Sequence, residues 1–123
     1  MCLSKTGNNA LNRKFDSLAR FLNMHVANGI PAKHIELALV VHGKAGLDLL
    51  SNKTYIKMAD RDNPNGDLLE QLMANQVQVY MCGQSAAYME IANRDLYKGV
   101  QMSLSAMTAH ALLHQQGYSL NPF

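Results

Sequence analysis

The sequence is poor in cysteine, with Cys2 and Cys82 as its two thiols. Two cysteines do not make the framework of a small disulfide-linked domain, and a reducing cytoplasm would keep both as free thiols. Cys2 lies so close to the start of the chain that we expect an idle surface thiol there. A function based on a thiol is therefore expected at Cys82.

Long hydrophobic stretches and blocks of like charge are also missing. No apolar run approaches the roughly 18 residues that would suggest a membrane span, and the first residues lack the apolar segment of a secretory signal. We therefore expect a cytoplasmic protein with no membrane partner. The 11 basic and 9 acidic residues give a net charge of +2 and form no basic block, so we expect no nucleic-acid partner.

Several familiar catalytic and cofactor motifs are absent. The segment Gly43-Lys-Ala-Gly46 lacks the spacing of a nucleotide-binding loop, no serine lies in a nucleophile elbow, and no carboxylates pair as in glycosidases. His110 and His114 stand four residues apart, which can place two imidazoles on one helical face. Ala111 occupies the position that is acidic in zinc proteases, and no third ligand is evident. We expect no metal and no cofactor, and we leave the roles of the two histidines open.

What the sequence does contain is an alternation of helical and strand patterns over 123 residues, the length of one domain. The continuous apolar run Leu37–Val41 suits a strand covered on both faces. The pattern predicts helices at about 8–26, 67–75, 84–93 and 106–116, strands at 37–41, 77–81 and 100–104, helical turns within 44–50 and 51–62, a loop at 61–66 and a last short strand within 118–123. Asn8 or Asn9 is expected to cap the first helix, and Ser105 the last.

This alternation predicts an α/β fold, a three-layer α/β/α sandwich in which residues 1–123 form a single domain. The sheet is expected to be mostly parallel, with four to five strands, because parallel neighbours need crossover connections. Such folds generally open with a strand, whereas this chain opens almost directly with a helix. Only Met1–Ser4 could form that strand, so we expect it to be vestigial or missing.

The segment from Gln76 to Ala86 carries the strongest functional signal. Here a strand pattern ends at Cys82, and Gly83 and a helical segment follow at once. A cysteine directly before a helix lies at the positive end of the helix dipole, which stabilises the reactive thiolate and lowers the thiol pKa. Burial as a structural cysteine is the alternative.

Ligand sites in parallel sheets lie outside the carboxyl ends of the strands. Three such ends are predicted here, and they place His42, Cys82 and Ser105 near one crevice, with Gly43, Gly83, Gln84 and Ser85 as further neighbours. His42 is either an acid–base partner of the thiol or a structural group.

Taken together, four segments resemble the DsrE/DsrF-like family of sulfur relay and intracellular sulfur oxidation proteins. They are Leu39-Val-Val-His-Gly43, Val79-Tyr-Met-Cys-Gly-Gln-Ser85, Ser103-Leu-Ser-Ala-Met-Thr-Ala-His110 and Gln116-Gly-Tyr-Ser-Leu-Asn-Pro-Phe123. The resemblance implies a five-stranded parallel sheet, a homo-oligomer such as a trimer or hexamer, and a persulfide-carrying cysteine at Cys82.

The expected function is thus that of a small sulfur carrier, which takes sulfane sulfur from a donor protein onto Cys82 and passes it to an acceptor protein. Whether such a carrier acts as an enzyme stays open. A non-catalytic module that binds a small ligand or a protein is the main alternative, because no second catalytic group is evident. A redox-sensing thiol is the third.

Overall fold

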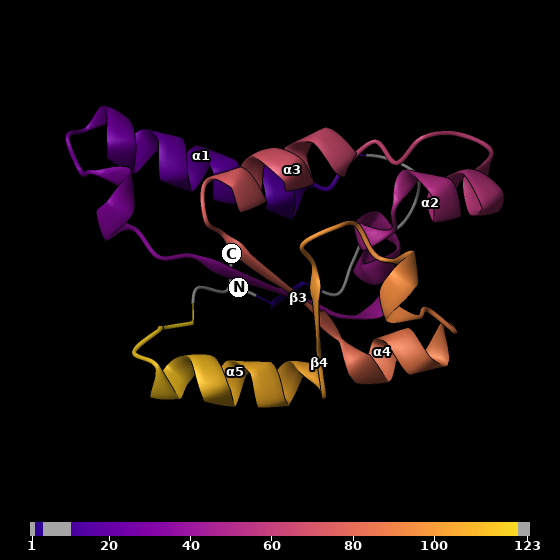
Figure 1. Cartoon of the computed structure of the whole chain (residues 1–123). Coiled ribbons are helices and arrows are strands. Elements are labelled where there is room, and N and C mark those ends of the chain that lie inside the picture. Colours follow the sequence, from indigo (N-terminus) through magenta and orange to yellow (C-terminus); the bar gives the residue numbers. More distant parts are fainter. Residues whose placement is uncertain (1, 4–10, 121–123) are drawn as a thin grey trace.

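The computed structural model describes residues 2–3 and 11–120. Helices and strands alternate through most of this length (Figure 1). In chain order the elements are β1 (Cys2–Leu3), α1 (Arg13–Ala27), η1 (Ala32–His34), β2 (Ala38–Val41), η2 (Gly43–Leu49), α2 (Asn52–Ala59), α3 (Gly66–Ala74), β3 (Gln78–Cys82), α4 (Gly83–Tyr88), η3 (Asn93–Asp95), β4 (Gln101–Ser103) and α5 (Ala106–Gln115), where η marks a 3-10 helix.

The strands form one parallel sheet in the order β1-β2-β3-β4. The opening strand is reduced to two residues, which pair with Val40 and Val41 of β2. At the other side, β3 pairs with β4 so that Cys82 lies opposite Ser103. The prediction of a mostly parallel sheet with a vestigial opening strand is confirmed.

Helices cover both faces of the sheet, and strict alternation along the strands assigns each side chain to a face. Leu39 and Val41 pack in the larger core with α1 and α3, whereas Ala38 and Val40 pack with α5. All four are buried, as the continuous apolar run in the sequence predicts. Figure 1 shows α1 and α3 on one side of the strands and α5 on the other, so the three-layer sandwich is confirmed. No helix within the described ranges has the length and apolar composition to cross a bilayer.

The first helix begins later than the sequence pattern suggests. Asn12, not Asn8 or Asn9, is its N-cap, because the Asn12 Oδ1 accepts hydrogen bonds from the amides of Lys14 and Phe15. Asn8 and Asn9 lie outside the described residues. The cap prediction was wrong because three asparagines precede this helix and only the tertiary contacts of Asn12 distinguish it.

Two further predictions differ from the structure. The helix expected over 84–93 ends at Tyr88, because Glu90 adopts a left-handed conformation with φ of 57° and the Ile91 amide turns back to the Ala86 carbonyl at 2.8 Å. These are the bonds of a Schellman motif, which stops a helix even without glycine. Residues 118–120 form no strand, and the rest of the predicted last strand, 121–123, lies outside the described residues.

A buried polar network joins the N-cap of α1, the 3-10 helix η2 and the loop between α2 and α3. The Asn12 side chain donates to the Asp48 Oδ2 at 2.9 Å, and its backbone amide donates to the Asn65 Oδ1 at 2.6 Å. Asn63 donates to the backbone carbonyls of Asp48 and Leu50, both at 2.8 Å. The network fixes the starts of α1 and α3 relative to η2, because a buried polar group without its partners costs free energy.

Replacing Asn12 by alanine should destabilise the protein strongly. Asn12→Ala removes the helix cap and one donor to the buried Asp48 carboxylate, so the free energy of unfolding should fall by about 2–4 kcal/mol. Urea denaturation followed by circular dichroism measures it. Asn23→Ala, at an exposed position of the same helix, should change stability by less than about 0.5 kcal/mol. Equal effects of the two substitutions would show that the network does not stabilise the fold.

Candidate functional site

Cys82 is the last residue of β3 and the N-cap residue of α4. Its side chain alternates with those of Val79 and Met81, which face α1 and α3, and therefore lies with Tyr80 on the α5 side of the sheet. Only 4% of the residue is exposed. The strand end predicted from the sequence is correct, and the thiol lies beneath the surface at the junction of β3, α4 and α5.

The sulfur of Cys82 lies among hydrogen-bond donors from two helix starts. Burial raises the pKa of the thiol, but the backbone amide and hydroxyl of Ser85 and the amides of Ala106 and Gln84 lower it, and the combined pKa lies below its ordinary value. Gln84 and Ser85 belong to the first turn of α4, and Ala106 is the first residue of α5. Amides at helix starts have no partner within their helix, so they are available to stabilise a thiolate.

Ser85 connects the sulfur to the neighbouring strand. Its Oγ accepts a hydrogen bond from the Gly43 amide at 2.9 Å, which leaves the hydroxyl proton free to point at Cys82. Gly43 follows the end of β2 and has a positive φ of 65°. The structure thus brings Gly43, Ser85 and Cys82 together, as expected for strand ends that share one edge of a sheet.

Gly83 allows the close approach that places α5 over Cys82. A Cβ atom at this position would lie 2.3 Å from the carbonyl oxygen of Ser103 and 2.9 Å from that of Leu104. Both are backbone atoms, so they could not move aside without shifting the connection from β4 to α5. Any side chain at Gly83 would therefore push the Ala106 amide away from the sulfur.

Ser105 acts on the site through the backbone. Its buried hydroxyl accepts from the Thr108 amide at 3.0 Å and so caps α5, as the sequence predicts. Ser103 Oγ lies 3.1 Å from the carbonyl oxygens of both Met81 and Ser105, which ties this connection to β3. From this connection, the group that contacts the sulfur is the amide of Ala106, which side-chain reasoning missed. The sequence could have indicated this amide, because an N-cap at Ser105 leaves the Ala106 amide unpaired within its helix.

His42 occupies a different part of this edge. It is half-buried at the N-terminal cap position of η2, and the interaction that the structure shows for its ring is an electrostatic one with His110. The side chain of Gln84 is exposed, so this residue contributes its backbone amide. Of the predicted neighbours of Cys82, Ser85 and Gln84 thus contact the sulfur, while Gly43, Gly83 and Ser105 position the groups around it.

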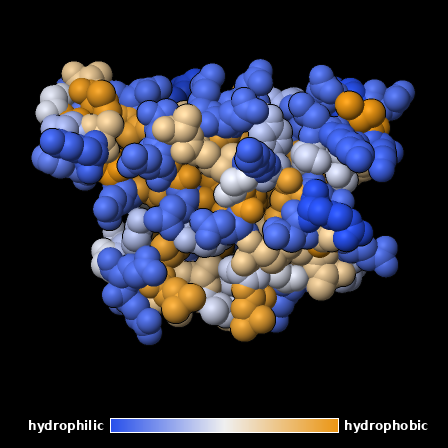
Figure 2. Space-filling model, viewed as in Figure 1, coloured by the Kyte–Doolittle hydropathy of each residue, from blue (hydrophilic) through white to orange (hydrophobic). Residues whose placement is uncertain are grey.

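Large exposed apolar side chains lie on the connection from β4 to α5, in the first turn of α5 and at the end of α4. Leu104 is 79% exposed and Met107 77% exposed, and Tyr88 at the end of α4 is 90% exposed. A groove of about 300 Å³ continues from Leu104 between β4 and α5 as far as Leu112. Figure 2 shows hydrophobic surface along this lower side of the molecule, over α5 and the end of β4. Large exposed apolar side chains that cluster in this way are typical of contact surfaces.

His110 and His114 lie on α5 and line a separate pocket, at the start of β2. Within residues 2–3 and 11–120, no group of three or more histidine, cysteine or acidic side chains lies close enough to hold a metal ion.

Comparison with known proteins identifies the family. The profile of the DsrE/DsrF-like family matches residues 4–122, so the chain belongs to this family. Membership suggests a role in sulfur relay. Among solved structures, the chain is similar to the protein of unknown function MTH1491 from Methanobacterium thermoautotrophicum, with a TM-score of 0.70 and 12% identity over 98% of this chain and 94% of that one. At this identity the likeness establishes the fold. No curated protein matches the sequence.

Removing the Ser85 hydroxyl should make Cys82 less acidic. Ser85→Ala deletes one donor to the sulfur, so the thiol pKa should rise relative to the wild type. Iodoacetamide alkylation measured against pH, with mass spectrometry of the separate Cys2 and Cys82 peptides, reports the thiolate fraction at each cysteine. In the wild type, Cys82 should reach half its maximal rate at a lower pH in the folded protein than in urea.

The control for this experiment is Ser17→Ala, on the α1 side of the sheet. It should leave the alkylation profile of Cys82 unchanged. The lowered pKa also means that ionisation of Cys82 favours the folded state: this contribution is present above the unfolded pKa and disappears as the pH falls through the folded pKa. An identical profile for Ser85→Ala and wild type would show that the hydroxyl does not act on the sulfur.

Proposed function

We propose that the protein is a persulfide carrier in which Cys82 accepts sulfane sulfur from a donor and passes it to an acceptor thiol. The observation that carries this proposal is the set of amide and hydroxyl donors around the Cys82 sulfur, which lower its pKa despite burial. Sulfur exchange requires a thiolate as attacking group. Membership of the DsrE/DsrF-like family supports the same chemistry.

The transfer step balances without a cofactor. The Cys82 thiolate attacks the outer sulfur of a donor persulfide, R–S–SH, and a new S–S bond forms as the donor's S–S bond breaks. The products are Cys82–S–SH and the donor thiolate, R–S⁻, which takes a proton from water. In the second half, an acceptor thiolate removes the outer sulfur from Cys82, and the amides of Gln84, Ser85 and Ala106 stabilise the returning Cys82 thiolate.

A loading experiment tests this proposal. After incubation with a cysteine desulfurase and cysteine, wild-type protein should gain the mass of one sulfur atom on the Cys82 peptide, and an acceptor thiol should then remove it. Cys82→Ser should lose the gain completely, whereas Cys2→Ser should keep it. If Cys82 gained no sulfur while a known carrier was loaded in the same reaction, the carrier proposal would fail. If Cys82→Ser also supported normal growth of the source cell, the alternative of a non-catalytic binding module would be favoured.

The burial of Cys82 adds a requirement for its partners. With 4% of the residue exposed, a donor protein has little direct access to the sulfur while the connection at Leu104 and Ser105 stays in place. As part of the proposal, a donor or acceptor protein contacts the apolar side chains of Leu104 and Met107 and displaces this connection. Such surface residues gain free energy when they are covered, which can offset the cost of opening.

A charged substitution at Leu104 distinguishes an effect on partner docking from an effect on the chemistry of the thiol. Leu104→Glu should slow loading by the desulfurase by about tenfold or more, because a charge would be buried in the contact. Loading by inorganic polysulfide, which needs no protein contact, should change by less than about twofold. Ile56→Glu, at an exposed apolar position on α2, should leave both rates unchanged. If Leu104→Glu slowed loading equally with both donors, the substitution would act on the thiol itself, and the proposed docking surface would be contradicted.

The compartment and the assembly belong to the same proposal. A reducing cytoplasm would keep Cys82 free for sulfur transfer, and the family resemblance supports one domain that assembles into a homo-oligomer, a trimer or hexamer. Light scattering of the purified protein determines the number of subunits, and a monomer at cellular concentrations would contradict this part.

A further inference from the structure

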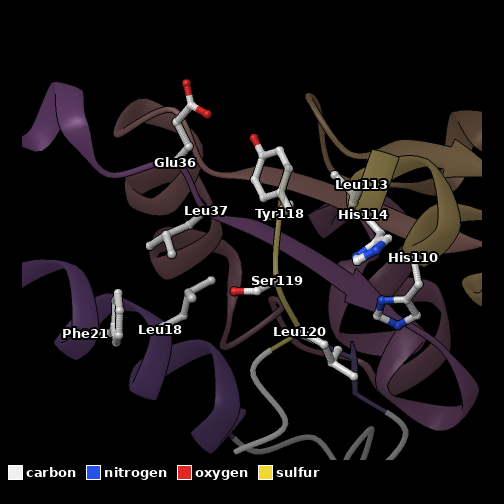
Figure 3. A pocket seen from close by; sticks show the side chains of 11 residues that line it. Leu18, Phe21, Glu36, Leu37, His110, Leu113, His114, Tyr118, Ser119 and Leu120 are labelled. Atoms are coloured by element: carbon white, nitrogen blue, oxygen red, sulfur yellow. The ribbon is translucent and has the colours of Figure 1, made fainter. Parts of the chain in front are cut away.

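A second site lies at the edge of the sheet, outside the junction that holds Cys82. Here a pocket of about 220 Å³ opens between α1, the start of β2, α5 and the segment after α5. Figure 3 shows its lining: Leu18 and Phe21 extend from α1 on one side, and the rings of His110 and His114 extend from α5 on the other. Among the described residues, β1 pairs with Val40 and Val41 and not with Ala38, which lines the pocket.

The pocket has an apolar side and a hydrogen-bonding side. Leu18, Phe21 and Leu37 provide the apolar surface, and Leu113 closes it from α5. The two imidazoles lie one helical turn apart and face the same space, as the figure shows. Each imidazole can donate an N–H, and a protonated ring adds a positive charge. Apolar walls with a few convergent polar groups are characteristic of small-molecule sites.

Two of the remaining polar side chains, Glu36 and Tyr118, lie toward the other end of the pocket, and Ser119 lies between the two ends. Figure 3 shows the Glu36 carboxylate turned outward, and this residue is exposed. The hydroxyl of Tyr118 accepts from the Gln78 side chain at 3.2 Å, and its pKa is raised by burial and by the charge of Glu36. The charge of Glu36 therefore affects the Tyr118 end of the pocket, and the two imidazoles provide the hydrogen-bonding groups of the other end.

We propose that this pocket binds a small organic anion, whose acidic group contacts His110 and His114 and whose apolar body packs against Leu18, Phe21 and Leu37. The volume limits the ligand, since drug-sized sites start at roughly 300 Å³; a molecule on the order of ten non-hydrogen atoms fits this pocket. Burial is the main cause that lowers the pKa of His110, and a bound anion next to the ring would oppose that shift. The site is independent of the sulfur chemistry proposed for Cys82.

Three compounds with one shared body test the proposal on the wild-type protein: phenylacetate, neutral phenylacetamide and cationic phenethylamine. Titrations followed by ¹H–¹⁵N NMR give the affinity and locate the binding. Phenylacetate should bind with a dissociation constant of about 1 mM, as expected for so small a ligand, and about tenfold more tightly than phenylacetamide. Its shifts should concentrate on amides of the lining residues Leu37, Leu113 and Leu120. Equal binding of the three, a preference for phenethylamine, or shifts confined to other surfaces would overturn the proposal.

Variants then assign the preference to the two rings. His110→Leu/His114→Leu should reduce the preference for phenylacetate over phenylacetamide from about tenfold to about twofold or less. His34→Leu, an exposed histidine on η1 outside the pocket, should preserve the preference. Retention of the tenfold preference in the double variant would contradict the assignment. The wild-type comparison of three compounds does not depend on these variants, and the alkylation profile of Cys82 should stay unchanged when phenylacetate is bound.

Discussion

The contact between Gly83 and the carbonyl oxygens of Ser103 and Leu104 is the constraint on which the site depends. A virtual Cβ at Gly83 would lie 2.3 Å from one of these oxygens, so only glycine lets the end of β4 pass so close to the start of α4. That approach brings the first amide of α5 to the sulfur of Cys82. Without it, the thiol would be stabilised by α4 alone.

The two faces of the sheet divide the structural and the chemical roles. On the α1 side, the larger core and the buried network around Asn12 and Asp48 hold the helices in place. On the α5 side lie the Cys82 sulfur and the groove beside β4, and the histidine pocket lies at the edge of the sheet between α1 and α5. A single helix covers that second face in the described part of the chain, and the large apolar side chains of Leu104, Met107 and Leu112 are exposed there.

Burial raises the pKa of Cys82 and so opposes its ionisation, and the fixed hydrogen-bond donors around the sulfur compensate for this effect. A thiolate in a low-dielectric site is costly unless donors surround it. Here the donors come from backbone amides and one hydroxyl, none of which carries a charge. For the sulfur transfer proposed above, these neutral donors provide the stabilisation of the thiolate that the reaction requires.

Much of the fold and the position of Cys82 could be predicted from the sequence. The apolar run over β2, the strand that ends at Cys82 and the Ser105 cap of α5 all depend on local patterns, since hydrophobic period and capping chemistry act over a few residues. The end of α4 at Tyr88 could not be predicted, because a glutamate at position 90 takes the left-handed conformation that glycine usually provides.

Other features arise only when distant segments meet. Asn12 differs from the asparagines that precede it because it forms hydrogen bonds with Asp48 and Asn65, which come from distant parts of the chain. The amide of Ala106 meets the Cys82 sulfur, and His110 and His114 meet α1 and β2 across a pocket. The sequence by itself determined the strands, the helices and the thiol at a strand end, because these follow from short-range pattern. The tertiary structure decided which donors surround that thiol, because hydrogen bonds and close packing depend on where separate segments come to lie.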